Sequence, residues 1–185
     1  MWEWYEWRRT LVTEAVPNAG HEALVKLERR IPGLLLGTQN VDGLHAKTGS
    51  RGVVELHDII LRAKCSTEGM LAEPEDHDAS VPPRCPRCGA FLRADVVWFG
   101  EMLPRGALEV AREAARGCDL FLSIGTSSFI YPAAALPYEA RENGALLLVI
   151  NPSETPLGCQ ADYALRGWAG AVLPGPLCEA FASPR

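Results

Sequence analysis

Three short apolar runs, each followed by a polar loop, constrain the fold of this chain more than any other feature. The runs cover residues 33–37, 118–124 and 145–150. Buried apolar strands of this length are typical of a parallel sheet that is covered on both faces. The sequence therefore predicts parallel strands, with a polar loop at the carboxyl end of each one.

Segments with helical spacing separate these strands. Residues 21–31 have mixed apolar and polar spacing and stop at Pro32 and Gly33, while residues 106–116 and 132–143 are each followed by a glycine. Glycine after the last periodic residue is a frequent helix stop. Strands that alternate with helices predict an α/β fold, and ligands of such sheets bind at the carboxyl ends of the strands.

The bulk properties exclude several classes of protein. The chain has 185 residues, 48% hydrophobic composition and a formal net charge of −5, so one main domain is expected and nucleic acid is an unsuitable partner. No apolar stretch approaches the roughly 20 residues that cross a bilayer, and residues 1–9 lack the apolar core of a signal peptide. We therefore expect no membrane partner and a cytoplasmic location, where the six cysteines would remain thiols or metal ligands.

Residues 65–89 have a different character from the rest of the chain. Cys85 and Cys88 have the spacing of a zinc-binding turn, and Cys65 lies at the distance expected of a partner pair. Glu68 occupies the place of a fourth cysteine, so the fourth ligand would be Glu68, His77 or water; a metal-free loop is the alternative. We predict a small zinc-binding module at 65–89 inserted into a main domain formed by 1–64 and 90–185.

Two other segments carry polar groups suited to chemistry. The loop 38–45 places Gln39, Asn40 and Asp42 after a buried strand, which suits hydrogen bonding to a ribose or a carboxamide, although a simple Asx turn uses the same residues. His57 ends the alternating run 53–56, where a histidine could act as a general base or be structural.

The order of these segments resembles the sirtuin family, and within it the class III bacterial deacylases. The resemblance rests on Pro-Asn-Ala-Gly-His at 17–21, Thr-Gln-Asn-Val-Asp at 38–42, Glu-Leu-His at 55–57, the cysteine module, Val-Val-Trp-Phe-Gly-Glu at 96–101, Gly-Thr-Ser at 125–127 and the loop at Asn151. It covers nearly the whole chain. It implies a Rossmann-like parallel sheet with helices on both faces and a small zinc-ribbon-like insertion.

The resemblance also implies roles for the residues of the NAD site. His57 would be the catalytic base that drives a ribose hydroxyl of NAD into attack on the alkylimidate. The NAD contacts would come from residues of four loops: Gln39, Asn40 and Asp42 around the ribose and nicotinamide, and Gly125, Thr126, Ser127, Asn151 and Ala169 around the adenosine half.

The protein partner implied by the resemblance is an acylated lysine. Val97 and Phe99 would flank the acyl-lysine tunnel, and residues 97–100 would pair in β fashion with the substrate peptide. Tyr5 and Arg8 match the Tyr-x-x-Arg pair of class III sirtuins, which implies a preference for succinyl, malonyl or glutaryl groups over acetyl. Without that resemblance, an arginine paired with Glu3 or Glu6 would be the ordinary expectation for such a helix.

The sequence departs from the family at two places. The family opens with a strand and a Gly-Ala-Gly-x-Ser loop that holds the NAD phosphates, and these 185 residues contain no such loop, so weak NAD binding is expected of them. Asp58 stands where the family has glycine, and its side chain could crowd the substrate or place a negative charge beside His57.

The sequence thus predicts an NAD-dependent protein-lysine deacylase with desuccinylase, demalonylase and deacetylase activity. Two alternatives stay open at this point. One is a catalytically silent binding module, favoured by the absent phosphate loop. The other is an ADP-ribosyltransferase of the same fold, which would have no need for the Tyr5 and Arg8 pair.

Overall fold

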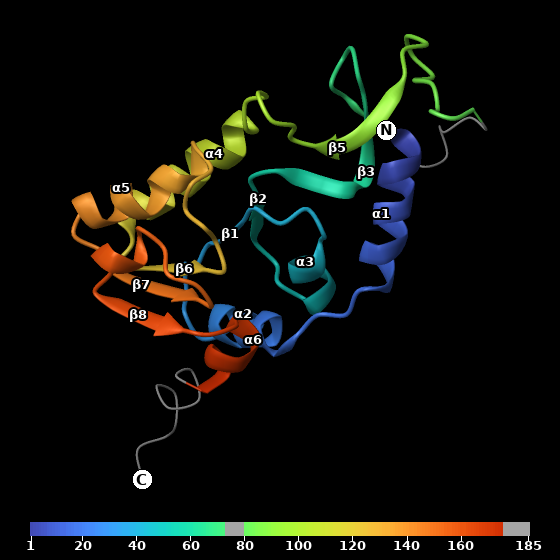
Figure 1. The fold of residues 1–185 in the computed structure, drawn as a ribbon. Coiled ribbons are helices and arrows are strands. Elements are labelled where there is room, and N and C mark those ends of the chain that lie inside the picture. The colour runs from blue at the N-terminus through green and yellow to red at the C-terminus, as the bar shows by residue number, and fades with distance from the viewer. Residues whose placement is uncertain (73–79, 176–185) are drawn as a thin grey trace.

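The computed structural model describes residues 1–72 and 80–175. Three small sheets and the helices around them make up the described part of the chain (Figure 1). In chain order, the elements are α1 (Trp2–Glu14), α2 (Ala19–Glu28), β1 (Leu36–Thr38), α3 (Leu44–Thr48), β2 (Val53–Glu55), β3 (Asp58–Cys65), β4 (Leu71–Ala72), β5 (Leu92–Val96), α4 (Arg105–Gly117), β6 (Leu120–Ile124), η2 (Ala133–Ala135), α5 (Leu136–Glu142), β7 (Leu146–Asn151), η3 (Gly158–Gln160), β8 (Tyr163–Arg166) and α6 (Ala169–Val172).

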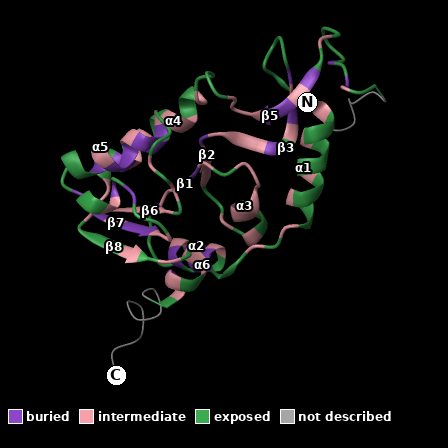
Figure 2. Ribbon diagram, viewed as in Figure 1, coloured by how far each residue is buried: buried purple, intermediate pink, exposed green. Residues whose placement is uncertain are grey.

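Strands β6, β7 and β8 form a parallel sheet that is covered on both faces, as predicted. On one face, Leu147 and Val149 of β7 pack in a cluster with Tyr138 of α5. On the other face, Ile150 packs in a cluster with Leu24 of α2. Figure 2 shows buried residues within the helices on either side of this sheet. Because alternate residues of a strand point to opposite faces, a nearly continuous apolar run is what this placement requires.

Strands β1 and β2 form a second parallel pair, with Leu36 opposite Val53 and Thr38 opposite Glu55. The predicted strand 33–37 therefore begins and ends later than expected. The cause is the end of α2, where Arg30 and Ile31 donate to the Leu27 carbonyl and Gly33 has a φ of 81°, so residues up to Gly33 complete a turn. In residues 1–72 and 80–175, β1–β2 and β6–β7–β8 are separate sheets.

An antiparallel sheet in the order β4–β3–β5 was not predicted. Strand β3 pairs with β5 over two stretches, Asp58–Ile59 opposite Asp95–Val96 and residues 63–65 opposite 92–94, with a register shift between them. Helix α1 lies beside this sheet (Figure 1). Pairing between segments about thirty residues apart depends on tertiary contacts, and no local pattern marks it.

Strand β8 also lies outside the predicted elements. Its residues are mostly exposed, so it lacks the apolar run that marks β6 and β7. Among the described residues, no helix is long and apolar enough to cross a membrane. The possible ligand His77 lies outside the described residues.

Candidate functional site

Loops from the carboxyl ends of three parallel strands meet at one place. The side-chain amide of Gln39, after β1, lies 3.5 Å from the hydroxyl of Thr126, after β6. The side-chain amide of Asn151, the last residue of β7, donates to the backbone carbonyl of Thr126 at 2.7 Å. These are residues for which the sequence predicted NAD contacts, and the two sheets bring them together at the edge where α/β proteins bind ligands.

His57 lies at the same edge, in the turn between β2 and β3. Its Nδ1 atom lies 2.9 Å from the backbone carbonyl oxygen of Gln39. A carbonyl oxygen only accepts hydrogen bonds, so in the neutral ring the proton resides on Nδ1 and the lone pair on Nε2. The His57 carbonyl in turn accepts from the Val97 amide at 3.2 Å. His57 is thus held from two sides with Nε2 available as a proton acceptor.

Asp42 serves the backbone of its own loop. Its Oδ1 atom accepts from the Leu44 amide at 2.9 Å, and this bond is the Asx turn considered above as the simpler interpretation. The backbone amide of Asn40 donates to the Thr38 hydroxyl at 3.1 Å, and the Asn40 residue is exposed. The turn and a ligand role are compatible because the second oxygen of Asp42 is not used by the turn.

Two histidine rings contact each other close to this loop. The rings of His21 and His45 have centroids 4.8 Å apart and are tilted by 49° relative to each other. Burial lowers the pKa of His45 from its ordinary value and the nearby His21 lowers it further, while Asp42 opposes the shift. These surroundings therefore favour a neutral His45 at its half-buried position in the first turn of α3.

The loops expected to hold the adenosine half also converge. Gly125 has a φ of 66°, a left-handed conformation that suits glycine, and its amide donates to the Ile150 carbonyl at 2.8 Å. Ser127 is exposed beside it. The Gly167 amide donates to the Asn151 carbonyl at 3.2 Å, which brings the start of α6 at Ala169 toward the same group of loops.

The cysteine module gathers a compact set of metal ligands. The ligand atoms of Cys65, Glu68, Cys85 and Cys88 all lie within 4.8 Å of one another, and the sulfurs of Cys65 and Cys88 are 3.4 Å apart. Three thiolates and a carboxylate form a donor set that zinc accepts in tetrahedral geometry. These residues fit the predicted zinc ion. Glu68 also lies 3.6 Å from Arg87, so a guanidinium group is close to this carboxylate.

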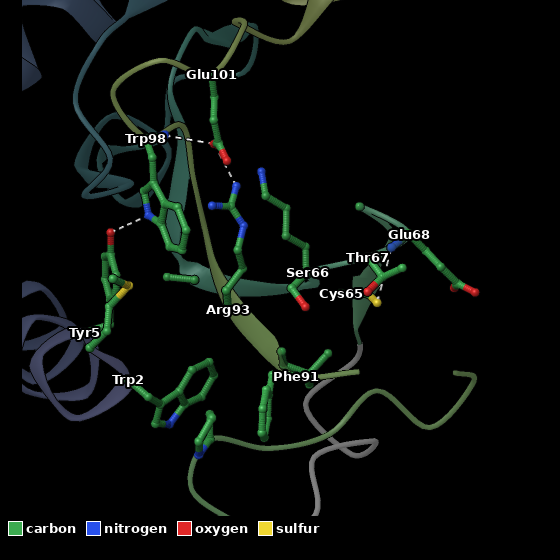
Figure 3. Close-up of a pocket in the computed structure, with 16 residues that line it drawn as sticks. Trp2, Tyr5, Cys65, Ser66, Thr67, Glu68, Phe91, Arg93, Trp98 and Glu101 are labelled. Atoms are coloured by element: carbon green, nitrogen blue, oxygen red, sulfur yellow. Dashed lines mark hydrogen bonds and ion pairs between the residues drawn. The ribbon is translucent and has the colours of Figure 1, made fainter. Parts of the chain in front are cut away.

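A cavity of about 630 Å³ lies between α1, the β3–β5 sheet and the cysteine module (Figure 3). The hydroxyl of Tyr5 points to Trp98, whose indole nitrogen donates to it at 2.7 Å. Arg93 stacks on Trp98 with its guanidinium carbon 3.9 Å from the ring centroid and pairs with Glu101 at 2.8 Å. Tyr5 and the segment after β5 thus share one wall of the cavity.

The structure separates the other predicted substrate residues. Arg8 is exposed and does not line this cavity; its guanidinium carbon lies 5.5 Å from the Trp4 ring. Phe99 is 97% exposed, whereas Val97 is half-buried next to His57. Residues 97–100 lie beyond the end of β5, and their turn is closed by hydrogen bonds in both directions between Trp98 and Glu101.

Sequence reasoning missed the residue that fastens α1 to this region. The guanidinium of Arg9 donates to the carbonyl oxygens of Ile60 at 2.7 Å and Arg62 at 3.0 Å. It also pairs with Glu6 and lies over the Trp2 ring. The signal that could have identified it is the spacing of Trp2, Glu6 and Arg9, which places all three on one face of a helix.

The position after His57 is occupied by a charged residue in an unusual conformation. Asp58 has a φ of 60°, and its carboxylate pairs with Lys64 at 3.2 Å. Burial raises the pKa of this carboxyl above its ordinary value and the neighbouring Asp95 raises it further, while Lys64 and Arg62 oppose the shift. A carboxylate whose surroundings disfavour its charge thus lies next to the candidate base.

Comparisons with known proteins agree with this geometry. The Sir2 family profile matches residues 1–132. An NAD-dependent protein deacylase of Aquifex aeolicus (strain VF5) is 47% identical over 174 residues, which cover 94% of this chain and 73% of that protein. A Sir2 homologue in complex with NAD superimposes with a TM-score of 0.89 at 42% identity, over 96% of this chain and 70% of that one. A Sir2 protein bound to an acetylated peptide gives a TM-score of 0.85 at 31% identity, over 93% and 74% of the two chains.

The profile match extends over more than half of the chain and includes α1, the loop after β1, His57 and the cysteine module. The sequence identity and the shared three-dimensional arrangement extend the agreement to the loops after β6 and β7. The chain therefore belongs to the Sir2 family, the sirtuins.

Proposed function

We propose that His57 is the general base of an NAD-dependent protein-lysine deacylase and that the loops around it form the NAD site. The contact that carries this proposal is the one between His57 Nδ1 and the Gln39 carbonyl, because it leaves Nε2 unprotonated at the edge where Thr126 and Asn151 meet. A base must present a free lone pair to its proton, and this arrangement provides one.

NAD-dependent protein deacylation is the activity of this chain, in keeping with its 47% identity to a deacylase and its likeness to a Sir2 homologue that binds NAD. NAD supplies the ADP-ribose that accepts the acyl group, with release of nicotinamide. In our proposal Gln39, Asn40 and Asp42 orient the ribose and the carboxamide. The adenosine half contacts residues of the next loops: Gly125, Thr126, Ser127, Asn151 and Ala169.

In our proposal the zinc ion is structural. Its ligands Cys65, Cys85 and Cys88, with Glu68 as the fourth, tie β3 to the turn before β5. All the described cysteines are free thiols, and a cluster of this kind needs reduced sulfur. A reducing compartment supplies that condition, so we place the activity in the cytoplasm.

The substrate is an acylated lysine of a protein, with Val97 and Phe99 beside the acyl-lysine. The structure of a Sir2 protein with an acetylated peptide supports this class of partner. We further propose that Tyr5 and Arg8 favour acidic acyl groups. Trp98 donates to the Tyr5 oxygen, so the hydroxyl proton of Tyr5 remains free to donate to a carboxylate.

The surroundings of the Arg8 guanidinium support the same preference for acidic acyl groups. Glu6, a residue that could have neutralised it, pairs with Arg9 instead. Within the described residues, Arg8 has no ion pair with a carboxylate. An exposed guanidinium on the same helix as Tyr5, three positions later, can reach an acyl carboxylate and bind it with two parallel hydrogen bonds.

The test compares succinyl-, malonyl-, glutaryl- and acetyl-lysine forms of one peptide, with nicotinamide and deacylated peptide quantified together. We expect one nicotinamide for each acyl group removed and higher kcat/KM for the acidic groups. Arg8→Met should lower kcat/KM for succinyl-lysine by roughly ten- to a hundred-fold and change acetyl-lysine turnover far less.

The matched control is Arg105→Met, which removes an arginine that is 91% exposed on α4. It should leave every acyl substrate unaffected. Equal losses on succinyl- and acetyl-lysine in Arg8→Met would show that Arg8 supports the fold and does not read the acyl group. Absence of NAD-coupled deacylation with all four peptides would contradict the proposed function itself.

A further inference from the structure

Asp58 occupies a backbone conformation that side chains rarely adopt. Its φ of 60° lies in the left-handed region, which is sparsely populated except by glycine and, to a smaller extent, by asparagine and aspartate. It is the first residue of β3 and directly follows His57. The turn at Asp58 sends the His57 side chain toward Gln39 and the Asp58 carboxylate toward Lys64.

A chain of ion pairs extends from Asp58 across the antiparallel sheet. The Lys64 ammonium lies 3.2 Å from Asp58 and 3.0 Å from Asp95. Asp95 pairs with Arg62 at 3.0 Å, and Arg62 pairs with Glu55 of β2 at 2.8 Å. We call these five residues the charge ladder. It joins the residues immediately before and after the turn that carries His57.

Most of this ladder is shielded from solvent. The side chains of Lys64, Asp58 and Asp95 are 14%, 19% and 6% exposed. Ion pairs at such depth have fixed geometry, but they contribute little net stability because each charge has been desolvated. The raised pKa of Asp58 points the same way, since it shows that the surroundings disfavour the charged carboxylate.

The left-handed backbone of Asp58 and the burial of its charge are both unfavourable for stability. A stabilising role therefore does not explain why Asp58 stands at this position. Strained and charge-disfavoured residues of this kind are concentrated at functional sites, where their geometry serves the chemistry. Backbone hydrogen bonds connect the strands of the ladder to the loop after β1. Leu56 donates to the Thr38 carbonyl, and Ile60, which lies between Asp58 and Arg62 on β3, donates to the Val41 carbonyl at 2.9 Å.

We propose that Asp58 is a positioning residue: its ion pair with Lys64 anchors the left-handed turn and so holds the imidazole of His57 against the Gln39 carbonyl. This inference rests on the proposed role of His57 as the base. In this role the charge ladder keeps the turn fixed, so that Nε2 of His57 faces the substrate. The ladder itself does not need to contact the substrate.

The test uses Asp58→Gly, Asp58→Asn and Lys64→Met. Glycine accepts the left-handed conformation but removes the anchor, so kcat should fall by about ten-fold or more while KM for NAD and for the acylated peptide changes by less than about two-fold. Asn tolerates the same conformation and keeps an oxygen for Lys64, so Asp58→Asn should recover most of the lost kcat. Lys64→Met should lower kcat as much as Asp58→Gly does. The double variant that carries both substitutions should have a kcat no lower than either single variant.

A second measurement does not depend on activity. Long-range nitrogen–proton NMR of the imidazoles should show the Nδ1-protonated form of His57 in the unaltered protein and a mixture of tautomers in Asp58→Gly and Lys64→Met. Glu109→Gln, which removes an exposed carboxylate paired with Arg105 on α4, is the control and should change neither kcat nor these signals.

Unchanged kcat and unchanged His57 signals in Asp58→Gly would overturn the proposal and reduce Asp58 to a tolerated substituent. Lower thermal stability with kcat and the His57 signals unchanged would likewise assign the ladder a structural role only. If the unaltered protein lacked deacylase activity, the proposed function would fail, yet the NMR comparison would still decide whether Asp58 holds His57.

Discussion

The Nδ1 atom of His57 lies 2.9 Å from the backbone carbonyl oxygen of Gln39. This contact joins the turn between β2 and β3 to the loop after β1, so one bond sets both the tautomer and the direction of the ring. A side chain that is to remove a proton must have both properties fixed before the substrate arrives.

Replacing His57 should remove turnover without unfolding the protein. We expect His57→Tyr to lower kcat by at least about a hundred-fold, because tyrosine offers no basic lone pair at neutral pH. The thermal unfolding midpoint should change little, since the ring makes one hydrogen bond at a partly exposed position. Near-normal kcat in this variant would exclude His57 as the base.

Zinc content should depend on Glu68 in a graded way. We expect one zinc ion per chain in protein purified without chelator, weaker retention in Glu68→Ala and stronger retention in Glu68→Cys, because a thiolate completes a four-cysteine site. Metal analysis and titration with a zinc-binding dye give the order of affinities. Equal affinities in all three proteins would mean that water or another group is the fourth ligand.

Gly20 should be intolerant of a side chain. A β-carbon there would lie 3.1 Å from the Gly170 amide nitrogen and 3.2 Å from the Ala169 carbonyl carbon, so α2 and α6 would have to separate. We expect Gly20→Ala to destabilise the protein by roughly 1–3 kcal/mol in denaturant unfolding.

Gly106 provides the matched control for that substitution. It lies in α4, where an added β-carbon meets nothing within 4 Å, so Gly106→Ala should leave stability unchanged or raise it by up to about 1 kcal/mol. Equal effects of the two substitutions would show that the approach of α2 to α6 does not limit stability.

The stability contributed by Asp58 should decrease as the pH rises. Its folded-state pKa is raised, so between its ordinary value and that raised value the folded protein holds a proton that the unfolded chain has released. The unaltered protein should therefore lose stability relative to Asp58→Asn as the pH rises through that window. At neutral pH we expect Asp58→Asn to be at least as stable, and thermal unfolding of the pair from pH 3 to 8 measures the difference. The opposite trend would mean that Lys64 outweighs burial.

The sequence alone determined two strands of the parallel sheet, β6 and β7, and the polar residues at their carboxyl ends. The apolar runs at 118–124 and 145–150 became these strands; Thr126 lies in the loop after β6, and Asn151 is the last residue of β7. These features are local, because a strand buried on both faces must be apolar and a glycine or polar residue must end it. The spacing of the cysteines likewise predicted which sulfurs would meet.

The tertiary structure decided which of these groups are in contact and which protonation states they favour. The pairing of β3 with β5, the contact of Gln39 with Thr126 and the ion pair between Asp58 and Lys64 join segments or charges whose approach no local pattern encodes. The same is true of Tyr5, whose hydroxyl meets Trp98, a residue far along the chain. The spacing of residues along the chain fixes the direction of their side chains on one helix or strand, whereas the distance between two elements follows from packing. The tautomer of His57 and the charge on Asp58 depend on that distance.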